Sequence, residues 1–116
     1  KDNMKKIIEY DDFTDVDIRV GTIIHAEENN LLKKPSIILK IDFGDKIGIK
    51  KSSAQLRANY KISELINKQV AAVINFNPKQ IGNIISEVLV VGFPDANNQP
   101  ILLAPDKKVK NGVKLY

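Results

Sequence analysis

The segment GDKIGIKKSSAQL, residues Gly44–Leu56, decides the fold because it joins a strand pattern to a helix signal. A turn at Gly44-Asp45 precedes an alternating run that predicts a strand over residues 47–51. The spacing of Ser52 and Gln55 is that of a capping box, which predicts that a helix begins there. A strand that leads directly into a helix start places this segment at the centre of the predicted architecture.

The same segment concentrates groups that bind anions. Lys50 and Lys51 supply two ammonium groups, and Ser52 and Ser53 supply two hydroxyls. Together with the free N–H groups of a helix start, they predict a phosphate site. The alternative interpretation is a surface turn with solvated lysines.

On both sides of this segment the chain alternates between strand patterns and turns. A glycine inside the first strand, Gly21, predicts a bend or a β-bulge. Five strands with a short helix between the third and fourth are typical of an OB-fold, an all-β five-stranded Greek-key barrel. An up-and-down barrel or a small sandwich are the alternatives, because strand order alone does not fix pairing. The other strands are expected over residues 17–26, 36–43, 69–76 and 86–93. Helical turns are expected over 11–17 and 62–66, and the first of them could plug one end of the barrel.

Length and composition predict one domain, residues 1–116, with a net charge of +4. There is no cysteine and one histidine, so we expect no disulfide, no metal site and no cofactor. No apolar run reaches the roughly 18 residues of a membrane span, and no signal peptide is visible, so a cytoplasmic protein without membrane insertion is expected. Met4 is expected to be the natural start, with residues 1–3 as an added extension.

Basic charge is concentrated in the middle of the chain. Residues 31–70 carry nine basic and three acidic side chains, whereas residues 1–30 carry four and eight. Arg19 and Arg57 are the only arginines. Lysine contacts phosphate as a point charge and reads bases poorly, so a polyanion partner is predicted and sequence readout is not. The alternative is a lysine-rich composition without functional meaning.

An enzyme is not predicted. The sequence contains no arrangement of serine, cysteine and histidine that forms an activated nucleophile. The acidic pairs Asp11-Asp12 and Glu27-Glu28 fall in predicted loops or caps, and no Walker-type phosphate loop is present. His25 is interpreted as a structural or surface residue. The chain is therefore expected to be a binding module without catalytic residues.

Five motifs in order give the chain a family resemblance: DIRVG, DFG, IGIKKSSAQL, VAAVINFNPKQIG and SEVLVVG. In this series the sequence resembles the CsaA family, chaperone-like relatives of the tRNA-binding domains that are appended to methionyl-tRNA synthetases. The resemblance covers about residues 13–113. It implies an OB-fold core, N- and C-terminal extensions that form a homodimer, RNA binding and no catalytic residues.

One segment separates the branches of that wider family. Appended tRNA-binding domains resemble N-L-K-P-x-K-M-R-G, whereas this chain has Ile81, Gly82 and Asn83 at the last three positions. The missing arginine implies weaker tRNA affinity and favours the CsaA branch. That branch implies a chaperone for unfolded or export-bound polypeptides that retains tRNA binding, and the export machinery is a further candidate partner. The alternative is a stand-alone tRNA-binding protein that assists synthetases.

Two sets of candidate site residues follow. Phe76 and Tyr60 are candidates for stacking on bases, although Phe76 alone is more simply a core residue. Ile84 and Ile85 could equally be buried in a dimer interface. The predicted RNA-binding residues are Lys33, Lys34, Lys50, Lys51, Ser52, Ser53 and Lys79. The predicted peptide-binding or dimer residues are Phe76, Pro78, Ile81, Ile84 and Ile85.

Overall fold

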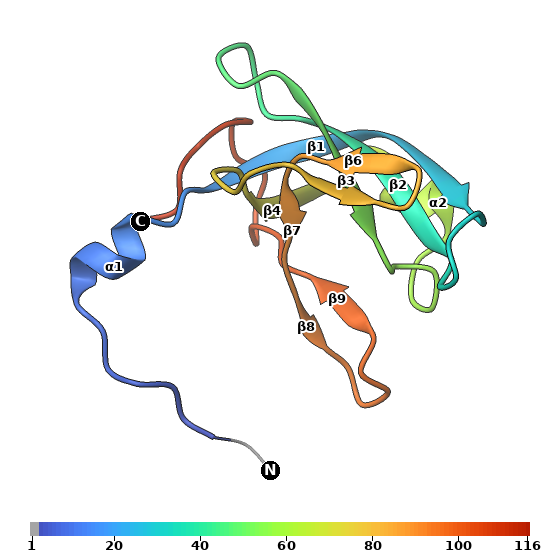
Figure 1. The fold of residues 1–116 in the computed structure, drawn as a ribbon. Helices are drawn as coiled ribbons and strands as arrows, with labels where there is room; N and C mark the ends of the chain where they lie inside the picture. The colour runs from blue at the N-terminus through green and yellow to red at the C-terminus, as the bar shows by residue number, and fades with distance from the viewer. Residues whose placement is uncertain (1–2) are drawn as a thin grey trace.

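The computed structural model describes residues 3–116 and is built on an antiparallel sheet of five strands in the order β3-β2-β1-β4-β7 (Figure 1). Lys1 and Asp2, to which the expectation of an added extension applies, lie outside the described residues. The sheet strands are β1 (Ile18–Asn29), β2 (Ser36–Asp42), β3 (Ile49–Ala54), β4 (Gln69–Val73) and β7 (Leu89–Val90). The remaining elements are α1 (Tyr10–Thr14), α2 (Ile62–Leu65) and the hairpins β5 (Lys79–Ile81) with β6 (Ile84–Ser86) and β8 (Gly92–Pro94) with β9 (Pro100–Leu102).

The sheet curls so that its two edge strands, β3 and β7, come close to each other without pairing, and this curled five-stranded sheet confirms the predicted OB-type fold. β4 pairs with β1 rather than with β3, so the topology is not that of an up-and-down barrel. At the open side, the backbone of Lys51 accepts a hydrogen bond from the N–H of Glu87 at 2.8 Å. The N–H of Ser53 donates to the hydroxyl of Ser86 at 3.1 Å. These contacts join the edge of β3 to the segment that leads into β7.

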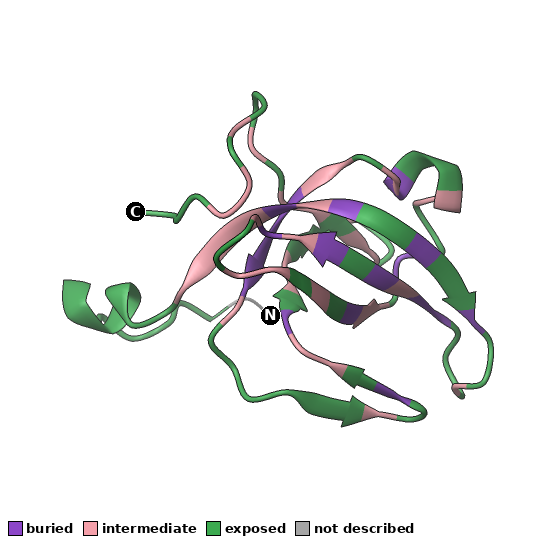
Figure 2. Ribbon diagram, turned by 90° about the horizontal axis from the view of Figure 1, so that it is seen from above, coloured by how far each residue is buried: buried purple, intermediate pink, exposed green. Residues whose placement is uncertain are grey.

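The core lies inside this curl, where aliphatic side chains of β1, β2 and β4 are fully buried (Figure 2). Gly21 belongs to this inner face, and a methyl group there would lie 2.6 Å from Ile41 and 2.8 Å from the ring of Phe43. The pairing register of β1 shifts between Ile23 and His25, so the predicted β-bulge lies at Ile24, beyond the glycine. Ile24 is consequently exposed, whereas Ile23 is buried.

The prediction of a helix start at Ser52 is wrong. β3 runs from Ile49 to Ala54, and its whole length pairs with β2. The positive φ of Gly48 ends the preceding turn, so the strand begins two residues later than predicted and continues through both serines. The helical turn expected over 62–66 is confirmed as α2, where Glu64 accepts the N–H of Lys61 at 2.8 Å.

Two hairpins were not predicted. The fourth strand ends at Val73 instead of residue 76, and the chain then forms the β5–β6 hairpin around a turn at Gly82, whose φ is +58°. The strand expected over 86–93 is divided among β6, β7 and β8. These short pieces pair with three different partners: β6 with β5, β7 with β4 and β8 with β9.

The two ends of the chain behave differently. Residues 4–14 project from the barrel, and α1 buries none of its side chains, so the expectation that it plugs the barrel is wrong (Figure 1). The C-terminal segment instead pairs with the N-terminal half of β1. The N–H of Gly112 donates to Val20 at 2.7 Å, and that of Leu115 donates to Ile18 at 2.8 Å. Neither helix in the described part of the chain has the length and apolarity that a membrane crossing needs.

Candidate nucleic-acid interface

A groove of about 330 Å³ lies between the edge of β3, the β5–β6 hairpin and the loop after β4. We call it the hairpin groove. It brings together four of the residues predicted for binding, which come from two distant segments of the sequence: Ser53, Phe76, Lys79 and Ile81. Asn77, Ser86, Glu87, Val88 and Leu89 complete its lining. The groove therefore offers a cation, hydroxyls and apolar surface within one hollow.

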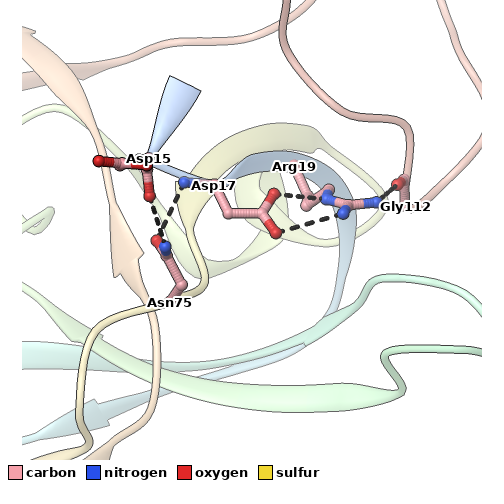
Figure 3. Close-up of polar contacts among 5 residues, drawn as sticks. All are labelled: Asp15, Asp17, Arg19, Asn75 and Gly112. Atoms are coloured by element: carbon pink, nitrogen blue, oxygen red, sulfur yellow. Dashed lines mark hydrogen bonds and ion pairs between the residues drawn. The ribbon is translucent and has the colours of Figure 1, made fainter. Parts of the chain in front are cut away.

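Phe76 is exposed at the rim of this groove, with 55% of its surface accessible, so its interpretation as a core residue is wrong for the subunit. The reason is Asn75, which draws the chain out of the sheet directly before it. The Asn75 amide accepts the N–H of Asp17 at 3.0 Å and donates to the carbonyl of Asp15 at 2.7 Å (Figure 3). An exposed aromatic ring beside a lysine is suited to stacking on a base.

The alternation of β3 separates the four residues that the sequence placed together. Ser52 lies opposite Leu39 on the inner face and is only 1% exposed, so it cannot contact a surface ligand. Lys50 shares that side of the strand and is half-buried. Lys51 lies on the outer face and is exposed, and Ser53, half-buried, borders the groove.

Lys40 is a candidate that the sequence analysis missed. It lies opposite Lys51 on β3 and opposite His25 on β1. These three exposed residues, which we call the basic row, cross three strands on the outer face. The His25 ring lies 3.4 Å from the carboxylate of Glu27. The alternation of residues 36–43 placed Lys40 on the outer face, but only the register of the β2–β3 pair shows that it faces Lys51.

The loop between β1 and β2 carries Lys33 and Lys34, which are both exposed. This loop contacts the tip of the β5–β6 hairpin, where Leu32 packs directly over Gly82. The side-chain amides of Asn29 and Asn83 hydrogen-bond at 2.9 Å beneath that contact. Lys33 and Lys34 follow Leu32 in the loop that contacts the hairpin tip, and neither of them lines the hairpin groove, so their place at the rim stays a prediction.

The predicted peptide or dimer residues divide by exposure. Phe76, Pro78 and Ile85 are exposed, and Ile81 is half-buried in the groove lining. Ile84 is only 7% exposed, so it packs within its own subunit and offers little surface to a partner. The second stacking candidate, Tyr60, is half-buried; its hydroxyl accepts the N–H of Leu102 at 3.0 Å, so it belongs to the barrel.

The lysines around the site form no ion pair, although the carboxylate of Glu87 also lines the hairpin groove. Within residues 3–116, Arg19 and Arg57 pair with carboxylates, and no lysine pairs with a described carboxylate. Arg19 bonds Asp17 through two nitrogens, at 2.6 and 3.2 Å, and this hydrogen bonding raises the pKa of Arg19 (Figure 3). In the described residues, no cluster of histidine and carboxylate side chains could hold a metal ion. The arrangement can bind an anion through lysines and a planar group through Phe76.

Comparisons with solved structures find the same fold at high identity. A chaperone CsaA from Bacillus anthracis str. Ames is 42% identical, with a TM-score of 0.88 over 96% of this chain and 100% of that chain. A CsaA chaperone protein from Picrophilus torridus is 50% identical, also with a TM-score of 0.88, over 95% of this chain and 100% of that one.

Similar curated sequences are far longer than this chain. The methionine–tRNA ligase of Pyrococcus abyssi is 33% identical over 99% of this chain, and that of Methanococcoides burtonii is 34% identical over 97%. The chain spans only 15% and 16% of those two proteins. The family model described as "Putative tRNA binding domain" matches residues 18–114, which include every strand and the whole candidate interface. The chain therefore belongs to this tRNA-binding domain family.

Proposed function

We propose that this chain is a non-catalytic RNA-binding module that holds tRNA on the basic row and in the hairpin groove. The observation that carries the proposal is the convergence of Lys79, Ser53 and the exposed ring of Phe76 in one groove. Membership of a tRNA-binding domain family supports the same partner. A cytoplasmic site of action accords with that partner.

The chemistry of the site favours recognition of backbone and shape. Lys51 and Lys79 would neutralise phosphates, and Ser53 would donate a hydrogen bond to a phosphate oxygen. Phe76 would stack on one unpaired base without regard to its identity. Both arginines are engaged, Arg19 with Asp17 and Arg57 with Glu28 at 2.9 Å, so neither is free to form a bidentate contact with guanine.

The test is a titration with bulk tRNA at several salt concentrations. The double variant Lys51→Gln with Lys79→Gln removes two phosphate contacts, so the slope of log K against log salt should become shallower by about 1.5. Lys5→Gln with Lys6→Gln makes the same change of charge on residues 4–14, the projecting segment that we call the arm, and serves as the control. Equal affinities and equal slopes for these two variants would refute the proposed site.

We propose binding of unfolded or export-bound polypeptide as a second function. The specific observation is the apolar part of the groove lining, Phe76, Ile81 and Leu89, beside an exposed edge of β5. An extended peptide could place apolar side chains there and pair its backbone with β5. The similar CsaA structures carry the name chaperone, which supports this proposal. The chain would meet an export machinery by delivering such bound polypeptides to it.

Salt separates the two functions. Capture of a fluorescent unfolded polypeptide should change little when the salt concentration is raised tenfold, from about 0.05 to about 0.5 M. Phe76→Ala should weaken it severalfold, whereas Lys51→Gln should leave it unchanged. If polypeptide capture is absent at every salt concentration while tRNA binds, the chain is a stand-alone tRNA binder.

We also propose that the chain forms a homodimer through its two ends. The arm exposes Met4, Ile7 and Tyr10, and Ile7 is 98% accessible. An apolar groove of about 250 Å³, lined by side chains of β1, β4 and the C-terminal segment, lies on the barrel. The arm of one copy would fill this groove on another.

A further inference from the structure

A second cationic surface lies along residues 105–112, which we call the tail loop. Its three lysines, Lys107, Lys108 and Lys110, are exposed. A groove of about 630 Å³ separates the loop from the start of β4 and contains Lys68, Lys107 and Lys108. On the other side, a groove of about 540 Å³ contains Lys110 and Lys46. The charge distribution of the sequence, which peaks over residues 31–70, did not single out this loop.

The tail loop is fixed to the barrel by side chains. The side-chain amide of Gln69 forms two hydrogen bonds with the backbone of Val109. Its nitrogen donates to the Val109 carbonyl at 2.7 Å, and its oxygen accepts the Val109 N–H at 3.1 Å. The Asn111 amide oxygen accepts from Thr22 at 2.8 Å, and Arg19 donates to the Gly112 carbonyl at 3.0 Å. The backbone of the tail loop, which carries the three lysines, is therefore ordered before any ligand binds, and this lowers the entropy cost of binding.

The charges of this surface are not balanced. The two grooves contain five lysines and three carboxylates, Asp45, Glu64 and Asp106. None of these lysines forms an ion pair with a carboxylate of residues 3–116. Lys107, Lys108 and Lys110 repel one another on an ordered backbone, and a polyanion would relieve that repulsion.

The tail-loop grooves and the hairpin groove are separate, because they share no lining residue. Their nearest link runs through the start of β1, where Asn75, directly before Phe76, bonds Asp17, and Arg19 bonds Gly112 (Figure 3). The far end of the β5–β6 hairpin bonds Asn29, seven residues along β1 from Thr22, and seven strand residues span about 23 Å. A folded RNA can occupy the separate grooves together, whereas a trinucleotide fits within one of them.

We propose that the tail loop is a second phosphate-binding surface, which takes the sugar–phosphate backbone of a folded RNA whose other part lies in the hairpin groove. The proposal rests on the proposed RNA-binding function and extends it to a second point of contact. Two separated contacts make affinity depend on the shape of the RNA, because only an RNA with the correct span engages both.

The experiment compares Lys107→Gln with Lys108→Gln against the control pair Lys5→Gln with Lys6→Gln. The ligands are bulk tRNA and the trinucleotide UpUpU, followed by NMR titration. The tail-loop variant should bind tRNA about tenfold or more weakly, with a salt slope shallower by about 1.5. Its affinity for UpUpU should equal that of the unmodified chain. Thermal unfolding checks that both variants fold.

Three outcomes decide the proposal. Unchanged tRNA affinity and slope in the tail-loop variant would overturn it. An equal loss for tRNA and UpUpU would also overturn it, because the lysines would then act only through the general field of the protein. If Lys51→Gln with Lys79→Gln binds tRNA normally while the tail-loop variant does not, the hairpin-groove site fails and the tail-loop surface stands.

Discussion

Gly21 lies where the barrel has no room for a side chain. A methyl group at this position would be 2.6 Å from Ile41 and 2.8 and 2.9 Å from two ring atoms of Phe43. Both neighbours are fully buried, so neither can move away without disturbing the core. The glycine is therefore required for packing, and its φ lies outside the left-handed region.

We predict that Gly21→Ala lowers the free energy of unfolding by about 1–3 kcal/mol through overpacking. Chemical denaturation measures the change. Phe43→Leu in the same chain should recover part of the loss, because it removes the ring that the methyl group meets. Gly48→Ala is a useful comparison, since its φ is +86° but no atom lies within 4 Å of an added methyl. A Gly21→Ala variant as stable as the parent would contradict this account.

At the level of single residues, the sequence predicted several of the side chains that line the hairpin groove, but not how β3 and the loop after β4 orient them. Lys79, Ser53 and Phe76 do converge, although they were assigned to different roles. Ser52 was misplaced because a capping-box spacing was read where the strand continues, and one more pair of strand residues turns that hydroxyl inward. Phe76 was expected in the core because it closes an apolar strand pattern. The hydrogen bonds of Asn75 that end this strand early are made to residues 58 and 60 positions away, which local sequence does not show.

The β2–β3 pair brings two positive charges together, which lowers the stability of the sheet but gathers cations for binding. Lys40 and Lys51 face each other directly across the two strands. Like charges in that position destabilise a sheet, and the nearby carboxylate of Glu87 bonds the backbone N–H of Lys51 at 2.9 Å. An anion bound across the basic row would offset this repulsion.

We predict that Lys40→Gln moves stability and binding in opposite directions. The free energy of unfolding should rise by about 0.2–1 kcal/mol because a cross-strand repulsion disappears. The affinity for tRNA should fall severalfold, because one phosphate contact is lost. Lys61→Gln, at the start of α2, should change neither quantity. A loss of stability in Lys40→Gln would show that the lysine has a structural role instead.

The turn of the β8–β9 hairpin depends on one carboxylate. Asp95 accepts the N–H of Gln99 at 2.9 Å, the amide of Asn59 at 3.0 Å and the N–H of Asn97 at 2.8 Å. The Gln99 bond is the main reason that the pKa of Asp95 is lowered. Because the folded pKa lies below the ordinary value of 3.8, the stabilisation is present above that value and is lost as the pH falls through the folded pKa.

We therefore predict that the amides of Asn97 and Gln99 lose protection from hydrogen exchange selectively in acid. Exchange measured by NMR at pH 5 and pH 3 should show faster opening of this turn at pH 3, after correction for intrinsic rates. Asp95→Asn keeps an acceptor but cannot titrate, so its turn should open equally at both values. The same acid sensitivity in Asp95→Asn would assign the effect to another group.

For the elements, periodicity located the five barrel strands and α2 but not the β5–β6 hairpin. Residues 77–83 contain a proline, two asparagines and a glycine, which read as a loop. β5 and β6, the three-residue strands on either side of the Gly82 turn, are too short to show a period. Contacts of β6 with β3, and of Gly82 with Leu32, stabilise the hairpin. Such tertiary contacts lie outside any local sequence window.

At the scale of the whole molecule, the projecting arm leaves large apolar side chains without a partner in the subunit. Met4, Ile7 and Tyr10 are all exposed, and the segment that carries them projects from the barrel (Figure 1). The family resemblance predicts extensions that form a dimer, and the arm is an N-terminal extension outside the barrel; the dimer itself stays a prediction. The sequence could not show the apolar groove that we propose as its binding surface, because that groove is assembled from three separate segments.

We predict that the chain sediments at micromolar concentration with twice its mass of 13.0 kDa. Replacing Ile7, Ile8 and Tyr10 by serine should give the monomer mass, because the apolar contacts of the arm are lost. Leu115→Ser, in the receiving groove, should weaken the dimer in the same direction. Lys5→Ser with Lys6→Ser should leave it intact. A monomer mass for the unmodified chain would refute the dimer.

The pairing of β1 with the C-terminal segment also sets the order of events during synthesis. Arg19 and Gly112, which hydrogen-bond at 3.0 Å, are 93 residues apart. At ribosomal rates of about 5–20 residues per second, the front half of β1 waits about 5–20 s for that partner. During this interval its edge is an open template for other strands. A protein proposed to bind unfolded chains thus passes through a stage at which its own nascent chain is unfolded and open to the same non-native strand pairing.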